Sequence, residues 1–115
     1  MSYDIRICVK AEGCDKYPAI AEPELSSPTY NLGTMFRKCM CWDYSQGNYY
    51  KCDFVIEKVE HGIKELKDNR NKYIKYNPKN GWGNIDGAID VLESLRTCIY
   101  EQAEDIPIDC LYMCW

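Results

Sequence analysis

Cysteine is the residue type with the most reactive side chain in this 115-residue sequence, which contains eight cysteines and one histidine. The cysteines are Cys8, Cys14, Cys39, Cys41, Cys52, Cys98, Cys110 and Cys114. A structural zinc site takes four thiolate or imidazole ligands, usually as two pairs with two residues inside each pair. The close pairs here, Cys39-x-Cys41 and Cys110-x3-Cys114, lack that spacing. A cysteine-bound metal is therefore an alternative, and our main expectation is a chain without metal or cofactor.

A disulfide framework is the other chemistry that eight cysteines suggest. Disulfide scaffolds are loop-rich and exported, whereas long helical patterns separate these cysteines and no export signal precedes them. We expect reduced thiols that fill the core as small apolar groups, together with the ten tyrosines.

The other residues that could act in catalysis do not form a recognised catalytic motif. His61 lies off the apolar stripe of its expected helix, and no local signature pairs it with a cysteine nucleophile. Asp86 and Asp90, four residues apart, place two carboxylates on one helical face, which suits either a divalent cation or an ordinary solvated face. We expect that the protein is not an enzyme.

Charge is unevenly distributed in the second half of the chain. Residues 64–79 hold six basic and two acidic residues, whereas residues 80–115 hold Arg96 and seven acids. This asymmetry favours oriented association with a partner or with a second copy of the chain. Tyr73 and Tyr76 lie among the bases and would stack on nucleobases, although a net charge of −4 disfavours nucleic acid as the main partner. The alternative is that residues 64–79 are only a solvated helix end and loop, without a partner.

Trp82 stands between two glycines ahead of an expected helix. Glycine permits positive φ, so the backbone can expose or insert this large ring. Trp82 either caps the core or lines a partner pocket. The motif is not a phosphate-binding fingerprint.

Periodicity predicts the elements that position these residues. Alternation predicts a strand over residues 4–10, and three prolines predict a loop or irregular edge over residues 11–28. Apolar spacing predicts helices over residues 31–42 and 49–68, a further helical turn over 69–76, and a third helix capped by Asn84. Residues 106–113 are predicted as a closing strand.

These elements predict one α+β domain over residues 1–115, with the N- and C-terminal strands in one small sheet packed against about three helices. Two strands alone are marginally stable, so we expect further pairing from the proline-rich segment or a second subunit. No apolar run is long enough to span a membrane.

Three segments carry a resemblance to a known family: Tyr30-Asn31 followed by Met35-Phe36, then Gly62-Ile63, then residues 77–83, Asn-Pro-Lys-Asn-Gly-Trp-Gly. In this order they resemble a family of small uncharacterised proteins encoded by bacteriophages and prophages. The resemblance covers the chain from residue 1 to residue 115. The large number of cysteines in this chain departs from the family pattern.

The resemblance implies a phage accessory protein that acts in the cytoplasm of the bacterial host. Such proteins act stoichiometrically against host defence systems, so we expect an inhibitor that binds a host defence protein, for example a CRISPR effector. The alternative from another class is an oligomeric sponge that sequesters a nucleotide immune signal. The expected contact residues are Tyr30, Asn31, Arg37, Tyr73, Tyr76, Asn80 and Trp82.

Overall fold

The computed structural model describes residues 3–11, 13, 16–28, 30–44, 48–81 and 83–115. Within them, four strands form one antiparallel sheet in the order β2-β1-β4-β3. The strands are β1 (Arg6–Val9), β2 (Ala19–Ala21), β3 (Tyr49–Lys51) and β4 (Leu111–Cys114). The α-helices are α1 (Gly33–Met40), α2 (Cys52–Asp68), α3 (Arg70–Tyr73) and α4 (Ile85–Ala103), and short 3-10 turns cover Tyr30–Leu32, Ile74–Tyr76 and Ile108–Cys110. The α+β prediction is confirmed.

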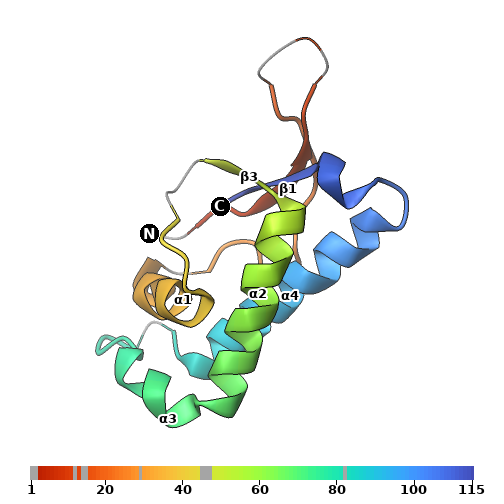
Figure 1. Ribbon diagram of the computed structural model, residues 1–115. Coiled ribbons are helices and arrows are strands. Elements are labelled where there is room, and N and C mark those ends of the chain that lie inside the picture. Colours follow the sequence, from red (N-terminus) through yellow and green to blue (C-terminus); the bar gives the residue numbers. More distant parts are fainter. Residues whose placement is uncertain (1–2, 12, 14–15, 29, 45–47, 82) are drawn as a thin grey trace.

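The first and last strands pair directly, as the sequence predicts. Ile7 stands opposite Met113 and Val9 opposite Leu111, and β2 from the proline-rich segment adds to the outer edge of β1. Ile7, Leu111 and Met113 have no exposed surface and belong to the same core as the helices. Figure 1 shows α2 and α4 side by side, extending away from the sheet.

Alternation along the strands sends a second set of side chains to the opposite face of the sheet. These side chains come from Arg6 and Cys8 on β1, Tyr112 and Cys114 on β4, and Tyr49 and Lys51 on β3. Cys8 and Cys114 are buried but lie outside the core cluster that contains Ile7 and Met113. We call this side of the sheet the outer face.

Three helices converge at Gly62. A β-carbon at this position would lie 2.7 Å from Met40 Cγ of α1 and 3.1 Å from Leu92 Cδ1 of α4. The buried stripe of α2, which includes Val55, Val59 and Leu66, continues on both sides of this contact. Glycine is needed here because the neighbouring helices approach too closely for a side chain.

Two element boundaries differ from the predictions by more than two residues. The helix predicted over residues 49–68 begins at Cys52, because Tyr49–Lys51 pairs with β4 as an edge strand and Lys51 keeps an extended backbone. Aromatic residues favour strands, and β4 offers an unpaired edge. The closing strand predicted over residues 106–113 is restricted to β4, because Cys110 donates a backbone hydrogen bond to Pro107 and closes a turn first.

Aromatic rings fill the end of the core next to α1. Trp115, which follows β4, lies within edge-to-face or tilted contact of Tyr3, Phe36, Trp42 and Tyr44. The Tyr44 hydroxyl donates to the Tyr3 hydroxyl at 2.9 Å, and burial raises the pKa of Tyr44. The expectation of buried cysteines is confirmed for five of the seven described cysteines, whereas Tyr3, Tyr44 and Tyr73 are buried and six other tyrosines are not.

Candidate binding surface

One of the contact residues predicted from the sequence, Tyr73, is buried in the structure. Tyr73 is only 1% exposed, and its hydroxyl donates to Glu65 Oε1 at 3.0 Å. Burial, with the nearby Glu65 carboxylate, raises the pKa of Tyr73 to about 12. The prediction of Tyr73 as a contact residue is therefore wrong: its ring closes the core beneath α3, and its hydroxyl is used internally.

The other predicted residues have different surroundings. The Arg37 guanidinium lies over the Tyr44 ring, 5.9 Å from its centroid, whereas Tyr76 packs beside Tyr73 and under Lys75. Asn31 and Asn80 are exposed. Trp82 and the side chain of Tyr30 lie outside the described residues. Arg37 and Tyr76 thus contact different parts of the core, and no described pocket is lined by both.

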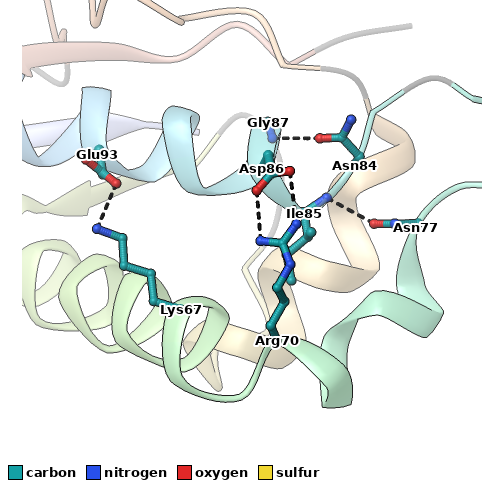
Figure 2. Close-up of polar contacts among 8 residues, drawn as sticks. All are labelled: Lys67, Arg70, Asn77, Asn84, Ile85, Asp86, Gly87 and Glu93. Atoms are coloured by element: carbon teal, nitrogen blue, oxygen red, sulfur yellow. Dashed lines mark hydrogen bonds and ion pairs between the residues drawn. The ribbon is translucent and has the colours of Figure 1, made fainter.

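The basic segment at residues 64–79 is tied to α4 by several polar contacts, shown in Figure 2. The Arg70 guanidinium donates to both carboxylate oxygens of Asp86, at 2.8 and 2.9 Å, and Lys67 pairs with Glu93 at 3.1 Å. Each partner of the Arg70–Asp86 pair shifts the other's pKa, upward for the arginine and downward for the aspartate. Asp86 is therefore engaged by Arg70, which argues against a cation site shared with Asp90.

Two asparagines complete this connection and fix the start of α4. The Asn84 side chain accepts from the Gly87 backbone N–H at 2.8 Å, which confirms the predicted N-cap. The Asn77 side chain accepts from the Ile85 N–H at 3.0 Å (Figure 2). Lys67, Arg70 and Asn77 of the basic segment thus have a structural role in joining it to α4.

A cluster of three tyrosines lies on the outer face of the sheet. Tyr17 and Tyr49 stack with ring centroids 4.2 Å apart and an interplanar angle of 11°. Tyr112 meets Tyr17 edge to face, with centroids 5.2 Å apart. Tyr49 is 44% exposed and the other two rings are half-buried. The sheet therefore presents aromatic surface from three separate segments of the chain.

Strand pairing explains how these rings meet. The backbone N–H groups of Val9 and Ala11 donate to Pro18 and Lys16, so the hairpin continues beyond β1 and places Tyr17 opposite Lys10. Tyr17 then reaches across the sheet to rings on β4 and β3. Cys8 and Cys114 lie on the same face, and burial raises the pKa of both thiols.

Basic side chains surround the tyrosine cluster. Lys51 stands opposite Tyr112, Arg6 stands opposite Cys114, and Lys10 stands opposite Tyr17. Arg6 forms an ion pair with Asp4 at 3.4 Å, in which both side chains remain substantially exposed. An exposed ion pair of this kind leaves the guanidinium accessible to another anion.

An open hollow of about 470 Å³ adjoins the stacked rings. Its lining residues are Ala11, Lys16, Tyr17, Pro18 and Tyr49. The lining thus combines two aromatic rings, two small apolar groups and one ammonium group, a set that suits a flat, partly anionic group.

A site on the outer face was not predicted from the sequence, since this face forms only when the strands pair. One signal was present: in the closing strand, Tyr112 lies between Leu111 and Met113, so alternation sends it to the face opposite the core. No comparable signal identifies Tyr17, which lies in a segment predicted as a loop, or Tyr49, which was predicted as the first residue of a helix.

The structure does bring one thiol close to the histidine. Cys41 Sγ lies 3.8 Å from His61 Nε2, and both side chains are exposed. Cys41 adopts a left-handed conformation at the end of α1, and its thiol lies 3.7 Å from the Lys38 carbonyl oxygen. The Cys41–His61 contact thus lies at the carbonyl end of α1.

A second hollow, of about 550 Å³, lies between α4 and the segment that follows β2. Its polar lining comes from Ser94 and Thr97, and the Leu25 N–H donates to Ser94 Oγ at 3.0 Å. Five carboxylates also line it: Glu22, Glu24, Asp90, Glu93 and Glu101. The chain therefore concentrates negative charge here, away from the tyrosine cluster.

Among the described residues, no three His, Cys, Asp or Glu side chains are placed to hold a metal ion together. The seven cysteines within the described part of the chain are all free thiols. No helix in the described ranges is long and apolar enough to cross a membrane.

Comparison with known proteins gives no match: no protein family model, curated protein or solved structure is detectably similar to this chain.

Proposed function

We propose that this chain is a non-enzymatic accessory protein of a bacteriophage or prophage that inhibits a host defence system by stoichiometric binding, in the cytoplasm of the bacterial host. The observation that carries the proposal of binding is the exposed tyrosine cluster on the outer face. The phage setting rests on the sequence resemblance at residues 30–36, 62–63 and 77–83.

The tyrosine cluster has the properties of a contact surface. Tyrosine brings a large, rigid and amphipathic area to an interface and loses little side-chain freedom on binding. Tyr17 and Tyr49 are already stacked on each other, so their rings are preorganised for a partner. Aromatic rings that served only the core would be buried, as Phe36 and Trp115 are.

The proposal of binding without catalysis is supported by the surroundings of the reactive groups. Burial raises the pKa of the Cys39 and Cys52 thiols to about 12, which keeps them protonated and unreactive near neutral pH. Cys41 is exposed and lies 3.8 Å from His61 Nε2. No described pocket is lined by both Cys41 and His61.

A titration against purified defence effectors tests this function. With the effector at a concentration far above the dissociation constant, activity should fall linearly with added chain and stop falling at a fixed molar ratio. Tyr49→Ala should abolish the inhibition, whereas Tyr100→Ala, which changes an exposed tyrosine on α4, should retain it.

Inhibition that needs far less chain than effector would indicate turnover and contradict a stoichiometric mechanism. The absence of inhibition across a panel of effectors, together with unchanged phage plating on hosts that carry them, would also contradict the proposal.

A further inference from the structure

We infer that the group held by the outer face is a single-stranded segment of nucleic acid, whose bases stack on the tyrosine cluster while its phosphates lie beside Arg6, Lys10, Lys16 and Lys51. This inference deepens the proposed function and rests on it, because it names the chemistry of the partner at that face: an exposed single strand within a nucleic-acid-containing defence complex.

The aromatic geometry supports base stacking. Bases of single strands stack on aromatic side chains that project from an antiparallel sheet, and this stacking tolerates many sequences because every base has a π face. Tyr49 is 44% exposed and lines the hollow, so part of its ring is accessible to a base. Tyr112 extends the aromatic surface toward β4.

The distribution of charge supports phosphate binding on this face despite a net charge of −4. Five carboxylates gather in the hollow beside α4, whereas the side chains of Lys10, Lys51 and Arg6 surround the tyrosines. Asp4 is paired with Arg6 on this side. A phosphate chain would find complementary charge on the outer face and repulsion at the α4 hollow.

The shape of the site favours a single strand over a duplex or a free nucleotide. Bases in a duplex are already stacked and paired, so their faces are not available to Tyr17 or Tyr49. A small ligand binds tightly when a pocket covers most of its surface, whereas this hollow is open and lies beside the Tyr17–Tyr49 stack. A strand lying across three tyrosines gains contacts that one nucleotide cannot make.

Fluorescence anisotropy with a labelled oligonucleotide of mixed sequence tests the inference. The arms are single-stranded RNA, single-stranded DNA, the duplex of the same sequence, and unlabelled mononucleotides as competitors. The chain should bind at least one single strand, more tightly than the duplex, and mononucleotides should compete poorly. The RNA and DNA arms distinguish which sugar the site accepts.

Matched variants separate the outer face from the rest of the surface. Tyr49→Ala should weaken single-strand binding by roughly 5- to 150-fold, the range expected for loss of stacking on one ring. Tyr100→Ala should leave it unchanged. Lys51→Gln should reduce the dependence of binding on salt by about one phosphate contact, whereas Lys64→Gln on α2 should not.

A third variant tests whether the loss of binding in Tyr49→Ala results from loss of folding. Tyr49→Leu retains apolar area on the sheet but removes the π face, and it should show the same loss of binding at an unchanged melting temperature. Failure of every single strand to bind would overturn the inference. Binding that Tyr49→Ala and Tyr49→Leu leave intact, or equal binding of duplex or mononucleotide, would also overturn it.

The outcome can be separated from that of the proposed function. Inhibition of an effector at a fixed ratio without any oligonucleotide binding would overturn this inference and leave the stoichiometric inhibitor standing. Tyrosine-dependent oligonucleotide binding without inhibition of any effector would support the inference and contradict the inhibitor.

Discussion

At the scale of single residues, the cysteines divide by environment. Cys41 and Cys110 are exposed, whereas the other described cysteines are buried: Cys8, Cys39, Cys52, Cys98 and Cys114. Burial raises the pKa of each buried thiol, most for Cys39 and Cys52, where it reaches about 12. These thiols behave as small apolar groups, because burial removes the water that would stabilise the charged thiolate.

This burial predicts a loss of stability in alkaline solution. Unfolded thiols ionise near their ordinary pKa of 9.0, whereas folded Cys39 and Cys52 keep their protons up to about pH 12. The folded chain therefore binds more protons between these values, and its free energy of unfolding falls as pH rises, by up to about 1.4 kcal/mol per pH unit for each thiol.

Urea denaturation under reducing conditions between pH 9 and pH 10, below the ordinary tyrosine pKa of 10.0, measures this slope. Cys39→Ala should make the slope shallower, and Cys110→Ser, at an exposed position, should leave it unchanged. An unfolding free energy that stays constant over this range would contradict the assignment of buried thiols.

Residue-level prediction from sequence succeeded where a helical stripe was visible. Cys39, Cys52 and Cys98 fall on apolar stripes, and all three are buried. Tyr73 was assigned to the surface because its neighbours are charged. Its burial depends on how α3 folds back against α2, where Glu65 accepts from its hydroxyl, and local sequence contains no information on that contact.

At the scale of elements, the close contact of α1, α2 and α4 at Gly62 gives a second prediction. Gly62→Ala should destabilise the chain by about 1–2 kcal/mol, because overpacking costs more than the gain in helix propensity. Gly87→Ala is the matched control: the nearest atom to its added β-carbon is Asn84 Oδ1 at 3.4 Å, so stability should stay the same or rise by up to about 1 kcal/mol.

Chemical denaturation of both variants measures the two changes. If Gly62→Ala were as stable as the wild type, the helices would not approach at this point as closely as described.

The periodicity of apolar residues correctly predicted the helices that pack against other helices. The stripes of α2 and α4 and the Asn84 cap are local features, and each is confirmed. β3 was missed because Tyr49–Lys51 is short and continuous in sequence with α2. Its strand conformation depends on the edge of β4, which lies more than sixty residues away. The outer face was missed for the same reason, since it exists only once the four described strands pair.

At the scale of the whole molecule, the fold separates two kinds of surface. One side of the sheet packs on helices, and the carboxylates collect beside α4. The other side carries stacked tyrosines among basic residues. This separation explains how a chain with an acidic net charge can offer a basic, aromatic face to a partner.

The most direct test of this account is an NMR titration of the labelled chain with the single-stranded oligonucleotide that binds best. We expect shift changes to concentrate on β1, β3, β4 and the residues around Tyr17, and α3 and the α4 hollow to be unaffected. Changes centred on residues 70–81, with the sheet resonances unmoved, would contradict the outer face as the binding surface.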